Sequence, residues 1–182
     1  VSEQSGREGK LDSTSFFLAY FYPRVAVMDD VDGWDRMNFT DAQEFYNDFN
    51  DYKVAVTVPK NFIVWGTGDL LNAKDLLQPS YLEKFNKSFT SDEVITIASQ
   101  ADVDAKNITT QNATNTWRWQ ATNVSDVAFC ISDHYVWDAA SVVVDKKTGR
   151  RASCQSAYIN SSKNFHNQVK HIQHSLDWYS NN

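Results

Sequence analysis

Two histidines near the C-terminal end are the first residues whose type and spacing suggest chemistry. His171 and His174 stand three residues apart, and on a helix this spacing brings both rings to one face, where they can approach one cation. The surrounding sequence has no HExxH motif, and no Cys or acidic residue there completes an obvious set of zinc ligands. We therefore interpret both histidines as surface or interface residues and expect no metal bound by this chain.

Other local patterns for catalysis are equally weak. The sequence has neither a Gly-x-Ser-x-Gly elbow nor a Cys with an orienting His beside it, although triads assembled in space leave no such local signal. Asp29, Asp30, Asp32 and Asp35 crowd one segment with nothing evident to raise a pKa. This run resembles a calcium loop only superficially, so we expect a solvated turn. No catalytic residue is predicted.

The two cysteines leave two alternatives open. Cys130 and Cys154 lack the spacing of a structural zinc site and are too few for a disulfide framework. Each lies in a β-like stretch, so they are either two buried free thiols, which we favour, or one disulfide between neighbouring strands.

Composition and charge exclude several classes of protein. The 182 residues, 42% of them hydrophobic, predict a globular domain rather than a disordered chain. Seventeen basic against 23 acidic residues give a net charge of −6 with no long basic run, which excludes a nucleic-acid surface. No stretch of the sequence has the length of a membrane span, and its start does not resemble a signal peptide.

The elements that must position any site are mostly strands. Alternating or continuous apolar runs predict strands in residues 15–27 (two, around a kink at Pro23), 52–59, 61–68, 116–122, 127–131, 135–144 and 152–159. This pattern places Phe129 and Trp137 on core-facing positions of adjacent β segments. Residues 79–100 are expected to form two short helices, and the polar residues 100–115 a loop.

The C-terminal residues 162–180 carry the clearest helical pattern. Large apolar side chains recur there at spacings of four, three, four and three residues, which is typical of one apolar stripe on a helix. The stripe consists of Phe165, Val169, Ile172, Leu176 and Tyr179.

Several segments, in the same order and spacing, resemble a known family of enzymes. The aromatic segment 16–34, which contains Tyr22-Pro23-Arg24, is followed by 44–54, 58–64, 117–129 and 135–139. Together they are similar to the N-terminal domain of bacterial zinc metallopeptidases of the aminopeptidase N and leukotriene hydrolase superfamily, in a Bacteroidetes-like branch. The resemblance covers about residues 15–180.

The resemblance implies a fold and a place in a larger enzyme. It implies a mostly β fold, part of a saddle-shaped β-sandwich with short helical insertions and one C-terminal α-helix. Residues 1–162 would be the N-terminal β domain, without its earliest strands and with a helical insertion near 79–100. Residues 163–182 would be a helix leading into an absent catalytic domain.

The same resemblance implies the chemistry and partners of the parent enzyme. Zinc would be bound by that catalytic domain, through HExxH and a downstream Glu, and a peptide would be the substrate. The chain itself would have no cofactor and no activity alone. It would form one wall of the peptide cleft and dock on the catalytic domain, in the periplasm or cell envelope rather than the cytoplasm.

Tyr20 is the one residue of this chain to which the resemblance gives a role in substrate binding. Relatives often carry a Gln just before the aromatic-Pro segment, and its side chain reaches the substrate's amino end. This sequence has Tyr20 there, whose phenol has a different reach. A Tyr packed only as part of the core is the alternative.

Two further expectations follow. The alternative function is a self-standing β-rich module that binds carbohydrate or peptide through exposed Trp34, Trp65 or Trp137. On the family reading, the apolar stripe of the C-terminal helix lacks its partner domain. We therefore expect the stripe to be poorly buried and the chain to self-associate through it.

Overall fold

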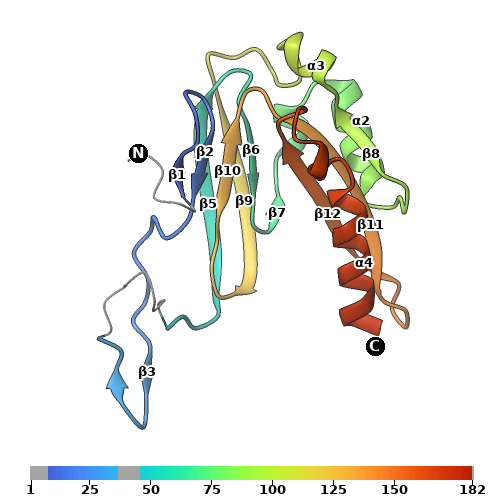
Figure 1. Ribbon diagram of the computed structural model, residues 1–182. Helices are drawn as coiled ribbons and strands as arrows, with labels where there is room; N and C mark the ends of the chain where they lie inside the picture. The colour runs from blue at the N-terminus through green and yellow to red at the C-terminus, as the bar shows by residue number, and fades with distance from the viewer. Residues whose placement is uncertain (1–7, 37–45, 182) are drawn as a thin grey trace. The chain divides into compact units, whose positions relative to one another are not determined.

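The computed structural model describes residues 8–36 and 46–181, and strand residues outnumber helical residues in it (Figure 1). The prediction of a mostly β chain is therefore confirmed. The described chain forms two compact units. Unit 1 falls within Val1–Val56, Val64–Leu71 and Trp117–Ile131, and unit 2 within Thr57–Ile63, Asn72–Thr116 and Ser132–Asn182. Residues 1–7 and 37–45 of the expected domain 1–162 lie outside the described residues.

Unit 1 contains most of two sheets. One has the strand order β1-β2-β10-β6, and the other has the order β5-β9-β7. In the first sheet β2 pairs antiparallel with both β1 and β10, with Cys130 opposite Phe17. The strands are β1 (Gly9–Lys10), β2 (Phe16–Leu18), β10 (Phe129–Ser132), β6 (Ile63–Gly66), β5 (Asn50–Pro59), β9 (Thr114–Val124) and β7 (Asp69–Leu70).

The core of unit 1 follows the alternation of β9. Trp117, Trp119 and Ala121 point to one face of this strand, as every second residue does, and all three are buried. The ring of Trp119 meets the ring of Phe129 from β10 edge to face, with centroids 6.4 Å apart. The two sheets of unit 1 therefore contact each other through aromatic side chains.

Residues 15–27 differ from the expected pair of buried strands. Only β2 forms, and Phe21 and Val25 are 48% and 77% exposed. The extended chain is interrupted at Tyr20, whose φ is +55°, and Pro23 offers no N–H to a ladder. The acidic segment after it is a turn, as predicted, and it joins β3 (Met28–Asp29) to β4 (Gly33–Trp34).

Unit 2 has a three-stranded antiparallel sheet covered by helices on both faces. The strand order is β12-β11-β8, from β8 (Ile95–Ala98), β11 (Val136–Asp145) and β12 (Arg150–Tyr158). Helix α2 (Pro79–Ser88) packs against β8 and β11, where Phe85 lies 5.5 Å from the ring of Trp137. Helix α4 (Gln168–Asn181) lies along β11 and β12 (Figure 1).

The predicted helical insertion is half right. Helix α2 begins at Pro79, as expected for a proline in the first turn. The expected second helix is instead strand β8, because the β-branched run around Ile95 pairs with β11. The expected loop at 100–115 contains the short helix α3 (Gln100–Asp104), which begins at a capping box of Ser99 and Asp102. A further short helix, α1, spans Ala73–Leu76.

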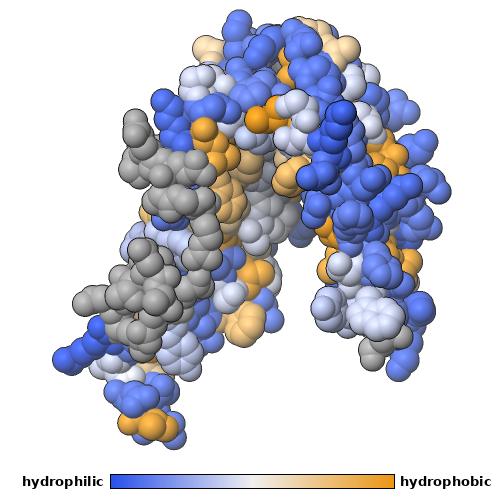
Figure 2. Space-filling model, in the orientation of Figure 1, coloured by the Kyte–Doolittle hydropathy of each residue, from blue (hydrophilic) through white to orange (hydrophobic). Residues whose placement is uncertain are grey.

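Helix α4 confirms the predicted C-terminal helix and overturns the expectation of an uncovered stripe. Val169 is 2% exposed and lies in a cluster with Ala140 of β11 and Cys154 of β12, against which Ile172 and Leu176 also pack. Only the two ends of the stripe, Phe165 and Tyr179, are exposed. Phe165 lies before α4, in a 3-10 turn at Lys163–Phe165. The side of unit 2 that carries α4 is mostly hydrophilic in the space-filling view (Figure 2). Self-association through this stripe therefore loses its structural basis.

The helices of residues 8–36 and 46–181 include none with the length and apolar character needed to cross a membrane.

Candidate functional site

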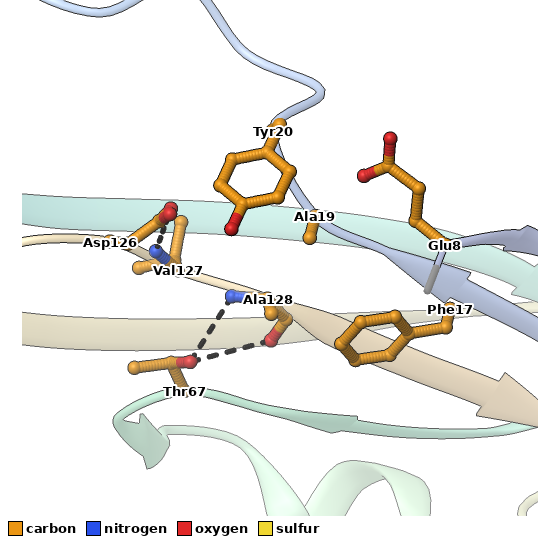
Figure 3. A pocket seen from close by; sticks show the side chains of 8 residues that line it. All are labelled: Glu8, Phe17, Ala19, Tyr20, Thr67, Asp126, Val127 and Ala128. Atoms are coloured by element: carbon orange, nitrogen blue, oxygen red, sulfur yellow. Dashed lines mark hydrogen bonds between the residues drawn. The ribbon is translucent and has the colours of Figure 1, made fainter. Parts of the chain in front are cut away.

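Unit 1 contains a cavity of about 380 Å³, and Tyr20 lines it. Figure 3 shows the side chains around it, which come from the start of the described chain, β2 and the segment after it, the residue after β6, and the segment before β10. The lining residues are Glu8, Phe17, Ala19, Tyr20, Thr67, Asp126, Val127 and Ala128. The only charged groups among these lining residues are the carboxylates of Glu8 and Asp126, so the lining is acidic.

Tyr20 is held in an uncommon conformation at the edge of this cavity. Its φ of +55° lies in the left-handed region, which costs a bulky residue about 1–2 kcal/mol. The Arg24 guanidinium carbon lies 5.1 Å from the centre of the Tyr20 ring and 5.1 Å from that of Tyr22. This cation-π stacking offsets part of the backbone strain and fixes the position of the phenol.

Asp126 anchors the other side of the cavity. Its Oδ2 accepts a hydrogen bond from Arg24 Nη2 at 2.9 Å, and its Oδ1 accepts from the Val127 backbone N–H at 2.7 Å and from the Tyr22 hydroxyl. Burial, and then the hydrogen bond to this carboxylate, raises the pKa of Tyr22 well above its usual range. Tyr22 therefore stays protonated and keeps donating, and Arg24 balances the charge of Asp126.

Glu8 is the carboxylate of the cavity that has an unpaired oxygen among the described residues. Its Oε2 is shielded from solvent and has no hydrogen-bond partner among the residues that the structure describes. A buried acceptor left in this state costs about 1–3 kcal/mol, and more when it is charged. A ligand that brought an N–H donor, above all a cationic one, would recover that free energy.

Hydrogen bonds between Thr67 and Ala128 hold one wall of the cavity in place. Thr67 Oγ1 accepts from the Ala128 N–H at 3.1 Å and donates to the Ala128 carbonyl at 3.5 Å (Figure 3). The backbone N–H of Thr67 also donates to this carbonyl, at 3.1 Å. The chain beside Asp126 is therefore held in one place, which preorganises the acidic lining.

The other candidates from the sequence lie away from this cavity. His171 and His174 are exposed on α4, and the described residues hold no group of three or more His, Cys, Asp or Glu side chains that suits a metal ion. Trp34 is 56% exposed, Trp65 is half-buried, and Trp137 is only 2% exposed, with Nε1 donating to Gln155 Oε1 at 3.0 Å. The expectation that Trp137 is available to a ligand is therefore wrong.

Both cysteines are free thiols, as favoured from the sequence. Cys154 is buried in β12, and Cys130 is half-buried in β10, in a different sheet. Burial raises the pKa of Cys130 to about 11, and burial also raises that of Cys154. Neither thiol has the lowered pKa of a reactive nucleophile.

The sequence names Tyr20, which lines this cavity, but gives no sign of its acidic neighbours Glu8 and Asp126. Glu8 lies in a polar start that showed no periodicity, and Asp126 lies in a loop between two strands. A fold is needed to bring residues 8, 20 and 126 together, so no local spacing could reveal the site. The hydrogen-bond partners Tyr22 and Arg24 did stand out, as part of the aromatic-Pro segment.

No protein-family model, curated protein or solved structure matches this chain.

Proposed function

We propose that this chain is a noncatalytic N-terminal portion of a zinc-dependent aminopeptidase, and that its cavity at Tyr20 receives the positively charged amino end of a peptide. The observation that carries the proposal is the position of Tyr20. The residue to which the family resemblance gives a role in amine recognition lines a cavity that Glu8 also lines. The Oε2 atom of Glu8 is buried and has no hydrogen-bond partner among the described residues.

The chemistry of the cavity supports an ammonium ligand. An ammonium group has three N–H donors, and Glu8 Oε2 is an acceptor in need of one. Asp126 adds negative potential although Arg24 already pairs with it, and the Tyr20 hydroxyl can accept or donate. Glu8 would bind the cation, Tyr20 would orient it, and the backbone at Thr67 and Ala128 would hold the wall in place.

The finer fold assignment belongs to the same proposal. Two sheets in contact through Trp119 and Phe129 agree with a β-sandwich of the aminopeptidase N type. On the same resemblance, zinc would belong to the parent's catalytic domain. The catalytic domain of the same polypeptide and a peptide substrate are the partners that the proposal includes.

The alternative is a self-standing module that binds carbohydrate or peptide, and exposed Trp34 is the observation that favours it. Because such a module would not depend on a free amine, the two functions differ in a measurable way.

A titration followed by ¹H–¹⁵N NMR tests the proposal. Leucinamide, which has a free amine and no carboxylate, should shift the backbone amides of Tyr20, Val127 and Ala128, and N-acetyl-leucinamide should not. Tyr20→Phe removes the hydroxyl and should weaken binding several-fold. Tyr179→Phe on α4, where the ring is 85% exposed, is the matched control and should leave binding unchanged. Equal shifts with both compounds, or shifts centred on Trp34, would favour the alternative.

A further inference from the structure

A second cavity, of about 660 Å³, lies in unit 2 on the face of the sheet that carries α4. Asp138, Ala140 and Val142 are alternate residues of β11, and the last two pack in the cluster around Val169 of α4. Asp138 therefore lies on the same face, beside the start of the helix. We call this cavity the α4 groove. Its lining residues come from β8 and the residues beside it, the start of α3, β11, the end of β12, the segment between β12 and α4, and the first turn of α4.

Asp138 is a largely buried lining residue of the α4 groove, and its carboxylate has unused hydrogen-bond acceptor positions. It is 7% exposed, and its carboxylate accepts hydrogen bonds from Thr96 Oγ1 at 2.7 Å and from the Tyr158 hydroxyl at 2.5 Å. A carboxylate offers about four lone-pair positions, so about two remain. Burial, followed by the hydrogen bond to Asp138, raises the pKa of Tyr158 far above its usual range, which keeps its proton in place as a donor.

The rest of the lining combines donors and acceptors without a dominant charge. Gln100, Asn160 and Asn167 contribute carboxamide side chains, each with both donors and an acceptor. Lys170 contributes one positive charge, which matches the single negative charge of Asp138, and His166 adds an imidazole. The lining therefore does not select for a charged ligand, in contrast to the acidic cavity of unit 1.

Apolar surface completes the groove. Val94, Ala101 and Val136 add apolar surface to a lining that is otherwise polar. The volume of the groove lies in the range of small-molecule sites. Within the described residues, no cluster suited to a metal ion is present there or elsewhere. The best match is an uncharged ligand whose polar groups both donate and accept, and which has apolar C–H faces. Sugar rings have all of these properties.

We propose that the α4 groove binds a neutral saccharide of one or two rings, whose hydroxyls donate to Asp138 and exchange hydrogen bonds with Gln100 and Asn167. Every residue involved belongs to unit 2, so this inference is independent of the amine site proposed for unit 1.

The test is a ¹H–¹⁵N NMR titration of the full chain with cellobiose, lactose and maltose as separate probes. At least one should give saturable shifts of the amides of Thr96, Ser99 and Lys170. The double variant Gln100→Ala/Asn167→Ala removes two carboxamides that are not buried, and it should weaken that binding about tenfold or more. Asn86→Ala, which removes an exposed carboxamide on α2, is the control and should bind as the wild type does.

A second variant tests the role of Asp138 in the groove. Asp138→Asn keeps the size of the side chain but replaces one acceptor oxygen with a donor, so it should also weaken binding, while unchanged amide shifts in β12 would show that the sheet is intact. The proposal is overturned if none of the three saccharides gives saturable shifts, or if the double variant binds as tightly as the wild type. A response of these amides to n-butylammonium but not to any saccharide would equally overturn it, in favour of a cation site.

Discussion

Cys130 shows at the residue scale how burial controls chemistry in this chain. It lies in a strand between β2 and β6, and desolvation disfavours the thiolate, which is the reactive form. The same reasoning separates the two carboxylates of the cavity in unit 1. The carboxylate of Asp126 accepts hydrogen bonds from three donors, namely Arg24, Tyr22 and the Val127 N–H, and Arg24 also balances its charge. The Oε2 atom of Glu8, by contrast, has no partner among the described residues.

The first prediction concerns the pH dependence of Cys130 alkylation. Because its pKa is raised to about 11, the thiolate fraction should rise about tenfold per pH unit throughout pH 8–10, with no plateau in that range. The rate of reaction with iodoacetamide, followed by mass spectrometry, measures this fraction. Cys130→Ser, which retains only Cys154, is the control for site assignment. A rate that levels off by pH 9 would show an ordinary thiol and contradict the burial.

The second prediction concerns two buried aromatic residues. Phe129 and Trp137 are 1% and 2% exposed, which confirms their predicted burial, but they lie in different sheets rather than in adjacent β segments. Truncating either to Ala should lower the free energy of unfolding by about 3–5 kcal/mol. In hydrogen exchange, Phe129→Ala should expose β2 and β10, and Trp137→Ala should expose β8 and β12. An unchanged melting temperature would show that the side chain is not in a core.

At the element scale, Gly66 shows why β6 can approach β10 closely. A Cβ built on Gly66 would lie 2.4 Å from Phe129 Cε1 and 3.2 Å from Trp119 Cδ2. A methyl group therefore does not fit unless an aromatic ring moves, and that ring is itself buried against the opposite sheet.

The third prediction follows from this contact. Gly66→Ala should lower the free energy of unfolding by about 1–3 kcal/mol, the usual cost of overpacking a core. Urea denaturation monitored by tryptophan fluorescence measures it. Ser161→Ala, an exposed turn residue, is the control and should change the free energy by less than about 0.5 kcal/mol. A neutral Gly66→Ala would mean that the two sheets of unit 1 are not in close contact.

The elements also show which parts of the secondary structure a local sequence pattern can predict. The alternation in β5 and β9, the largely apolar run of β11 and the helical spacing of α4 are visible in the sequence because each pattern is long. Strand β8 was mistaken for a helix, since Ser91 and the acidic residues after it imitate a helix start. Its true state depends on pairing with β11, some 40 residues away. Tyr20 is named by the resemblance alone, and only the fold brings Glu8 and Asp126 to the same cavity.

The fourth prediction concerns the docking of α4. Leu176 is half-buried against the cluster of Ala140, Cys154 and Val169, so Leu176→Glu places a charge against an apolar sheet face. The amides of α4 should lose protection from hydrogen exchange, and the sedimentation coefficient should show no change of oligomeric state. Tyr179→Glu, at an 85% exposed position of the same helix, is the control and should alter neither. If Leu176→Glu instead dissociated an oligomer and left the helix protected, the stripe would be an interface between copies.

At the scale of the whole molecule, the two units differ in the chemistry of their cavities. The cavity of unit 1 is lined by the carboxylates of Glu8 and Asp126, and the α4 groove of unit 2 has a lining that is balanced in charge. His171 and His174 line neither the cavity nor the α4 groove. We expect the purified chain to cleave no aminoacyl reporter substrate. After dialysis we expect it to retain no zinc, and one equivalent of zinc that is lost on replacing both histidines would contradict this.

The central claim is that Glu8 gives unit 1 its affinity for an amine, and the affinity of leucinamide for Glu8→Gln tests it most directly. The substitution keeps the size of the side chain and removes its charge. A hydrogen bond to a charged group contributes about 1.5–3 kcal/mol, so binding should weaken by roughly ten- to a hundredfold. Glu93→Gln, at an exposed position of unit 2, should bind as the wild type does. If Glu8→Gln and the wild type bind leucinamide equally well, the cavity at Tyr20 is not an amine site and the proposed function fails.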